Sequence, residues 1–311
     1  MDSSTLDDNI YITLEHLIAM EYKAKGFSFL PRQPIHSLLS GRHASRMRGR
    51  GLNFEELRGY LAGDDIRTID WKVTARTGEP YVRVYTEERD RPAFVMVDQR
   101  LSMFFGSQKY MKSVIAAKLA ALVAWRVFKV GDRIGAAVFN DSRIQQVRPH
   151  RSKSTVMQIL GTLVEQNQEL QANLSIAANP AQLNSTLDGV LQLIKHDYLI
   201  AIISDFYGLD QETTRMITLL AEHNDVLVFP VFDPLSTNFP ENTRLVVSNG
   251  ELQIELETSK GSLKQRMIDM ADDRLRTIMK WQEELSVPVL PLSTDSAPED
   301  QLRVLLGSRI V

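Results

Sequence analysis

The stretch FVMVDQRLSMFFGS (residues 94–107) decides the fold class of this chain. Its first four residues are all apolar, and a short unbroken apolar run is typical of a strand buried on both faces of a parallel sheet. A polar loop beginning at Asp98 follows, and residues 109–129 then carry apolar side chains at helical spacing, closed by Gly131. This strand, loop and helix form one unit of an α/β sheet covered by helices.

The same alternation continues to the end of the chain. Further strands are predicted over residues 133–139, 144–149, 198–204, 226–232 and 287–292. Helices are predicted over residues 154–170, 186–194, 210–223, 263–285 and 299–305. The predicted fold class is therefore α/β, with a doubly wound and mainly parallel sheet over residues 91–311.

Two turn sequences predict hairpins within this domain. Asn140 and Asp141 separate the strands of residues 133–139 and 144–149. Asn249 and Gly250 lie between alternating apolar residues, which is the strongest short-range hairpin pattern. The second hairpin is expected to be an insertion near residues 243–258.

Residues 1–90 have a different pattern and are expected to form a small N-terminal β-rich module. An amphipathic helix is predicted near residues 12–25, and Pro31 and Pro34 break the pattern that follows it. A basic stretch comes next, and residues 80–88 (PYVRVYTEE) have the character of a strand.

Composition narrows the classes of function. The 311 residues include no cysteine, which excludes disulfides, thiolate nucleophiles and cysteine-ligated metals. The net charge of −3 does not favour binding of the whole chain to nucleic acid. The start of the chain is acidic, and no apolar run reaches the roughly 18 residues that span a bilayer, so we expect a cytoplasmic protein without a membrane span.

The candidate site is defined by polar residues at the ends of predicted strands. Asp98 ends one strand, and Ser204 and Asp205 end another, while Thr186 opens a predicted helix. Because ligands of doubly wound sheets bind at the carboxyl ends of the strands, these oxygens with Ser102 would suit Mg²⁺. The alternative is that the two aspartates cap the helices that follow them.

The segment VDQRLSMFFGS resembles the D-x-S-x-S metal loop of von Willebrand factor A domains, through Asp98 and Ser102. Thr186 and the ISDF segment containing Asp205 lie where that family places its other metal ligands. The resemblance implies a divalent cation site in which Asp98, Ser102, Thr186 and Asp205 are the ligands. Arg100 occupies the position of the first motif serine, so Mg²⁺ binding is expected to be weak, and Arg100 is expected to pair with Asp98 or Asp205 instead.

Upstream, residues 51–88 (GLNFEELRGYLAGDDIRTIDWKVTARTGEPYVRVYTEE) resemble the hallmark of the bacterial DUF58 family. That resemblance implies a partner of MoxR-type AAA+ ATPases that acts in the assembly or activation of client proteins and is not an enzyme. A structural interpretation of the hallmark is also open, in which Gly63 to Asp65 form a turn, Tyr60 and Trp71 pack, and the arginines pair with acidic neighbours.

The resemblance to the DUF58 family implies a protein-interaction protein whose partners are a MoxR-type AAA+ ATPase and a client protein. The expected contact residues are Asp98, Arg100, Ser102, Thr186 and Asp205 at the sheet edge, with Arg46 and Arg48 of the basic stretch Arg42–Arg50.

Two other functions remain open at this point. The first is a Mg²⁺-dependent phosphoester hydrolase with Asp98 and Asp205 as metal ligands, although the sequence offers no evident base or nucleophile. The second is a nucleic-acid adaptor that uses the basic stretch, which lacks interleaved aromatic residues for base stacking.

Overall fold

Strand β3 (Ala93–Asp98) lies in the middle of a six-stranded sheet, and all six of its residues are buried. The computed structural model of the chain describes residues 8–24, 52–61, 63–87, 92–171, 177–236, 244–248, 253–257 and 261–306. The sheet order is β10-β7-β6-β3-β4-β5. Its other strands are β4 (Ile134–Phe139), β5 (Ile144–His150), β6 (Leu199–Ser204), β7 (Asp225–Phe232) and β10 (Leu292–Ser293).

The chain order of these strands is that of a doubly wound sheet. From β3 the chain runs outward through β4 to β5, and it then returns to place β6 on the other side of β3. All neighbouring strands are parallel except β4 and β5, which form the antiparallel hairpin predicted around Asn140 and Asp141. The predicted fold class, α/β with a mainly parallel sheet, is therefore confirmed.

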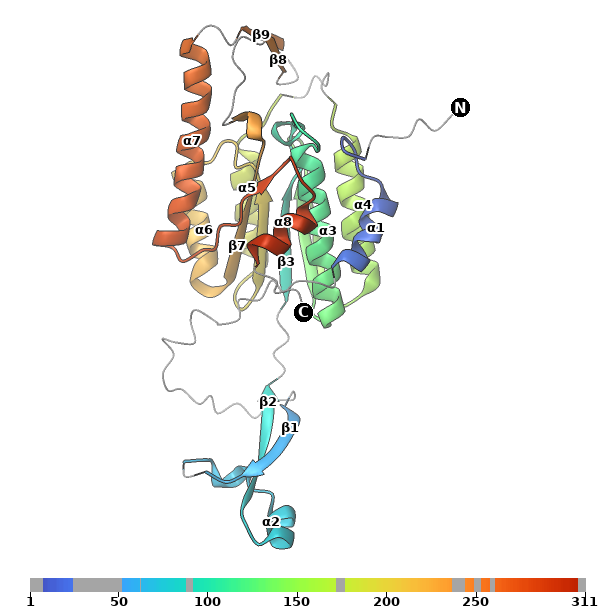
Figure 1. Cartoon of the computed structure of the whole chain (residues 1–311), viewed down its shortest axis with the longest axis vertical. Helices are drawn as coiled ribbons and strands as arrows, with labels where there is room; N and C mark the ends of the chain where they lie inside the picture. Colours follow the sequence, from blue (N-terminus) through green and yellow to red (C-terminus); the bar gives the residue numbers. More distant parts are fainter. Residues whose placement is uncertain are drawn as a thin grey trace. The chain divides into compact units, whose positions relative to one another are not determined.

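Helices cover both faces of this sheet (Figure 1). Alternate β3 residues face opposite ways: Val95 and Val97 pack among residues of α3 and α4, whereas Phe94 and Met96 pack among residues of α5, α6 and α7. The helices are α3 (Lys112–Val130), α4 (Lys153–Gln168), α5 (Gln182–Leu193), α6 (Gln211–His223), α7 (Gly261–Glu284) and α8 (Pro298–Leu305). Among the described residues, no helix is both long and apolar enough to cross a bilayer.

Two predicted elements differ in the structure. The strand expected over residues 287–292 reduces to β10, with an isolated bridge at Val289, because Pro288 and Pro291 have no N–H to donate to a ladder. The hairpin near residues 243–258 is present as β8 (Arg244–Ser248) paired antiparallel with β9 (Gln253–Glu257). Its turn residues Asn249 and Gly250 lie outside the described residues.

The predicted module of residues 1–90 needs a correction at its start. The chain divides into one unit of residues 31–90 and a second unit of residues 1–30 with 91–311. Helix α1 (Leu14–Lys23) belongs to the second unit because Leu17 and Met20 are part of its core and Trp125 Nε1 donates to the Leu17 carbonyl at 3.0 Å.

The unit of residues 31–90 is β-rich, as predicted. Strands β1 (Leu52–Gly59) and β2 (Tyr81–Glu87) pair antiparallel, with a bulge between Phe54 and Glu56. Between them lie a short 3-10 helix (Ile66–Thr68) and helix α2 (Trp71–Thr77). The Gly63–Asp65 turn is present, but Trp71 does not pack inside the unit, since 69% of its surface is exposed.

Candidate functional site

The candidate site lies where the sheet changes direction. Asp98 ends β3, and Ser204 and Asp205 end β6, the strand paired beside it. In doubly wound folds this switch point forms the crevice in which ligands bind. The structure therefore brings together the two aspartates that the sequence analysis selected.

A buried ion pair fills the centre of this site. Asp98 is 0% exposed and Arg100 is 1% exposed. The Arg100 guanidinium donates to both carboxylate oxygens of Asp98, with Nη2 to Oδ2 at 2.7 Å and Nε to Oδ1 at 3.0 Å. Ser204 Oγ donates to the same Oδ2 at 2.6 Å. The Asp98 carboxylate thus has a cation and a hydroxyl as close partners.

The rest of the Arg100 side chain is also engaged. Its Nη1 donates to the carbonyls of Pro180 at 3.2 Å and Tyr207 at 3.0 Å. The guanidinium carbon lies 5.4 Å from the ring centroid of Phe139 at the end of β4. Arg100 therefore ties together the loop before α5, the loop after β6 and the end of β4.

The charge of Arg100 is held firmly. Burial alone would lower the pKa of the guanidinium, but the carboxylates of Asp98, Asp205 and Asp141 outweigh burial and raise that pKa above its usual value. Arg100 is consequently a fixed positive charge at the switch point.

Asp205 has a cation of its own. Lys112 Nζ, in the first turn of α3, lies 2.6 Å from Asp205 Oδ2, and Ser102 Oγ donates to Oδ1 at 3.2 Å. Arg100 Nη2 is 3.9 Å from the same Oδ1. Burial would raise the pKa of Asp205, but Lys112, Arg100 and Arg274 together lower it well below its usual range. Asp205 is therefore an ionised carboxylate at neutral pH.

The turn after β6 is strained and closely packed. Phe206 has φ +54°, in the left-handed region that non-glycine residues seldom adopt. Its N–H donates to Ser204 Oγ at 2.8 Å, and its ring meets Trp281 of α7 edge-on at 5.5 Å. Arg274 of α7 donates to the Asp205 carbonyl at 3.2 Å and lies over the exposed Tyr207 ring. These contacts fix the turn that presents Asp205.

Thr186 does not open a helix, contrary to the prediction. Helix α5 begins at Gln182, so Thr186 lies in its second turn and is fully buried. Its hydroxyl donates to the Gln182 carbonyl at 2.7 Å, a local bond along the helix. It is the carbonyl of Pro180, before the helix, that contacts Arg100.

Three charged residues near this edge were missed by the sequence analysis. Lys112 and Arg274 come from helices and reach Asp205 across 93 and 69 residues of sequence. Asp233 follows β7 and accepts hydrogen bonds from Ser107 N at 2.7 Å and Thr294 Oγ1 at 2.5 Å. The sequence could have indicated Asp233, because it directly follows an apolar strand. No spacing rule indicates Lys112 or Arg274.

The expected contact residues differ in accessibility. Asp98, Arg100 and Thr186 are at most 1% exposed, and Asp205 is 7% exposed, so a partner could not reach the first three from outside. Ser102 is half-buried. Among the large hydrophobic side chains of the adjoining loops, Phe105 and Tyr207 are exposed. Arg46 and Arg48, with the rest of the basic stretch, lie outside the described residues.

This arrangement does not fit a magnesium site. Mg²⁺ requires about six oxygens at roughly 2.0–2.1 Å. Both oxygens of Asp98 are already bound by Arg100, and Oδ2 of Asp205 is bound by Lys112. Among the described residues, no three His, Asp or Glu side chains are grouped as metal ligands. The guanidinium of Arg100 and the ammonium of Lys112 supply the positive charge that a cation would supply.

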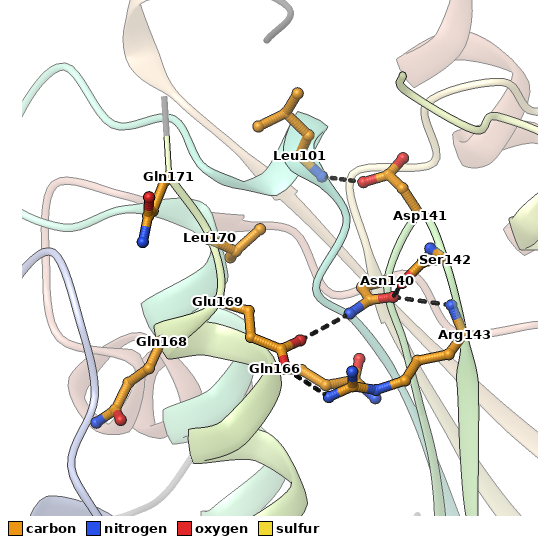
Figure 2. Close-up of a pocket in the computed structure, with 10 residues that line it drawn as sticks. All are labelled: Leu101, Asn140, Asp141, Ser142, Arg143, Gln166, Gln168, Glu169, Leu170 and Gln171. Carbon is orange, nitrogen blue, oxygen red and sulfur yellow. Dashed lines mark hydrogen bonds and ion pairs between the residues drawn. The ribbon is translucent and has the colours of Figure 1, made fainter. Parts of the chain in front are cut away.

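A separate pocket of about 440 Å³ adjoins the Arg100 loop (Figure 2). It is lined by Leu101, by the β4–β5 turn of residues 140–143, and by Gln166 and residues 168–171 at and after the end of α4. Asp141 of this turn accepts hydrogen bonds from Leu101 N at 2.6 Å and Asn179 N at 2.7 Å. Asp141 thereby links the pocket to the loops around the site.

Comparison with known proteins identified relatives over most of the chain. The uncharacterized proteins Rv1480 of Mycobacterium tuberculosis and Mb1516 of Mycobacterium bovis are each 26% identical to it over 268 residues, which is 85% of this chain and 81% of each relative.

Two solved structures are also similar. The conserved hypothetical protein BatB from Bacteroides thetaiotaomicron matches 68% of this chain and 94% of its own, with a TM-score of 0.37. The SpRpn10 VWA domain matches 70% of this chain and 97% of its own, with a TM-score of 0.38. Sequence identity is 11% in both cases.

The family comparison covers both units of the chain. The family described as protein of unknown function DUF58 matches residues 56–276, which include the second half of β1 and the whole Asp98–Asp205 site. This match confirms the resemblance carried by residues 51–88, and the chain belongs to the DUF58 family.

Proposed function

We propose that this chain is a protein-interaction protein, without catalysis of its own, that acts with a MoxR-type AAA+ ATPase in the assembly or activation of client proteins. One observation carries the proposal. At the switch point, where the fold offers a ligand crevice, Asp98 and Asp205 are buried and neutralised by Arg100 and Lys112. The site is built as a rigid internal support for the surrounding loops.

The same geometry weighs against the hydrolase alternative. A metal-dependent hydrolase would need Asp98 and Asp205 free to bind the ion, and it would need a base or an activated nucleophile. Instead, Ser204 Oγ is bound to Asp98 and Ser102 Oγ is bound to Asp205. These hydroxyls donate to carboxylates that stabilise charged neighbours, and neither carboxylate is left to act as a base.

Partner contact at this edge would then involve the loops and not the ion pairs themselves. The exposed large hydrophobic side chains there are Phe105, in the loop after β3, and Tyr207, in the turn after β6. Aromatic residues on a rigid support are frequent anchors of protein interfaces. Asp98, Arg100 and Asp205 would act by fixing these loops.

The proposal is tested with the purified full chain and the MoxR-type ATPase of the same organism. Calorimetric titration with ATP present should give saturable binding. A parallel assay should measure hydrolysis of phosphomonoester and phosphodiester substrates in Mg²⁺ or Mn²⁺. Turnover that disappears in a folded Asp98→Asn variant, together with no binding to the ATPase, would establish the hydrolase in place of the interaction protein.

A further inference from the structure

The unit of residues 31–90 has an unusual distribution of apolar and polar side chains. Over residues 57–61 and 63–83, the only buried hydrophobic side chain is that of Val82. Leu61, Ile66 and Trp71 are exposed at 64%, 66% and 69%. A two-stranded sheet is at best marginally stable by itself, so the exposure of these three large apolar residues requires an explanation.

Buried and half-buried aspartates, not these apolar residues, hold the segment between β1 and β2 in place. Asp64 accepts two hydrogen bonds from Arg58 and one from Leu61 N, each at 2.8 Å. Asp70 accepts the N–H groups of the first turn of α2 and is bound by Arg83 Nε at 2.8 Å. Hydrogen bonds from Arg58 and Arg83 lower the pKa of both carboxyls. The local backbone is therefore fixed without help from Trp71.

Unpaired positive charges accompany the exposed apolar residues. Arg67 follows Ile66, Lys72 follows Trp71, and Arg76 lies one helical turn further along α2; all three are exposed. Within the described part of the chain, none of these cations has an ion-pair partner, whereas Arg58 and Arg83 are both paired. Exposed tryptophan and arginine side chains are the residue types that dominate binding energy at protein interfaces.

We propose that these side chains form a docking face for an acidic surface of a protein partner, with Trp71 as its apolar anchor. The docking face consists of Leu61, Ile66, Arg67, Trp71, Lys72 and Arg76. The uncompensated cations select an acidic partner, and Trp71 requires an apolar pocket among the partner's acidic groups. The inference rests on the proposed function, because that function supplies the protein partner.

The fluorescence of Trp71 can be used to measure docking. The chain has three tryptophans, and Trp125 and Trp281 are 0% and 1% exposed. Quenching of fluorescence by acrylamide, a neutral quencher, therefore reports on Trp71. In the isolated chain, one tryptophan component should be readily quenched, and saturating amounts of the purified ATPase should protect it.

Variants of the full chain distinguish a specific role of the docking face from the general effect of removing an exposed aromatic side chain. Trp71→Ala should weaken binding at least about 30-fold, as expected for an interface anchor. The double reversal Arg67→Glu with Lys72→Glu should slow association and remove most of the salt dependence. Tyr22→Ala is the matched control, because Tyr22 is an aromatic residue, 77% exposed, on α1 of the other unit, and it should bind as the wild type does.

A photo-crosslinking residue at position 71, with position 22 as control, covers the case in which the ATPase does not bind. A partner protein that is crosslinked only from position 71 would then be purified. It must protect Trp71 from acrylamide quenching, and it must bind the Trp71→Ala variant at least about 30-fold more weakly than the wild type. This outcome would support the docking face while the proposed ATPase partnership fails.

Several results would overturn the docking face. The first is ATPase binding that neither protects Trp71 nor responds to Trp71→Ala, which would leave the proposed function standing. The second is the absence of any crosslink specific to position 71. The third is a Trp71 that is already protected from acrylamide in the isolated monomer. The last two are protection of Trp71 when the chain forms a dimer, and protection of Trp71 by added single-stranded RNA.

Discussion

At the scale of single residues, the buried pair of Arg100 and Asp98 is the feature with the largest energetic consequence. Removing one member of a buried ion pair leaves the other charge uncompensated, which costs about 3 to 5 kcal/mol. Arg100→Ser should therefore lower the free energy of unfolding by about that amount, measured by urea denaturation. Arg215→Ser is the control: Arg215 makes an exposed ion pair with Glu212, and its loss should change the free energy of unfolding far less.

The same variant tests how Arg100 relates to a metal. Arg100→Ser restores the hydroxyl of the D-x-S-x-S loop and leaves Asp98 without its cation. Millimolar Mg²⁺ should then raise the melting temperature of Arg100→Ser, because an ion that binds only the folded state stabilises it. The wild type should not respond. An equal rise in both proteins would show that the guanidinium does not take the place of the metal.

Asp205 makes stability depend on acidity. Its pKa is lowered in the folded protein, so its contribution is fully present above the unfolded value of about 3.9 and is lost as pH falls toward the folded value. The destabilisation caused by Asp205→Asn, measured by urea denaturation, should therefore be largest near pH 7 and shrink between about pH 5 and pH 3. The exposed Asp188 provides the control substitution Asp188→Asn. A difference that grows on acidification would contradict the assigned charge state.

The sequence could indicate the site residues at strand ends, but not those that reach the site from helices. Asp98 and Asp205 follow apolar strands, and the rule for carboxyl ends of parallel strands places them together. Lys112 and Arg274 reach the same point from helices, and their contribution depends on the packing of α3 and α7. The predicted helix start at Thr186 lies inside α5, which begins at Gln182 with no side-chain cap at Ala181 to mark its start.

At the scale of elements, two glycines of the α/β unit make opposite contributions. Gly131 ends α3 with φ +93°, and a Cβ there would lie 3.2 Å from Arg151 Nη2. Gly131→Ala should cost about 1 to 2 kcal/mol, since other residues resist this conformation. Gly161 lies within α4 with nothing within 4 Å of a Cβ, so Gly161→Ala should add about 0.5 to 1 kcal/mol. Thermal unfolding of the two variants should move in opposite directions.

The elements with strong periodicity or unbroken apolar runs were predicted within a few residues. Strand β6 and helix α6 are examples, because burial on both faces and a capping box at Asp210 determine them locally. The prediction of a strand over residues 287–292 was wrong for a local reason, because the segment contains two prolines. The assignment of α1 to the N-terminal module was wrong for a non-local reason. Nothing in residues 12–25 indicates which unit their apolar face will join.

At the scale of the whole molecule, residues 31–90 are an insertion into the α/β unit. Helix α1 precedes them and β3 follows them, yet both contribute to the same core through Leu17 and Val95. Neither core cluster of the α/β unit contains a residue from 31–90 in the part of the chain described. The fold of the larger unit should therefore not require the inserted one.

Replacing residues 31–90 with a flexible Gly/Ser linker of about a dozen residues tests this division. The variant should unfold cooperatively in urea, with a free energy within about 1 kcal/mol of the α/β transition of the full chain, because its core is complete. Leu17→Ala should destabilise both forms by a similar amount of about 2 to 5 kcal/mol, which would show that α1 still docks on α3. A variant that aggregates, or that no longer responds to Leu17→Ala, would mean that residues 31–90 are needed to hold α1 against the sheet. Loss of partner binding in a variant that keeps both folding results would assign the contact to the inserted unit, since the sheet edge with Asp98 and Asp205 is retained.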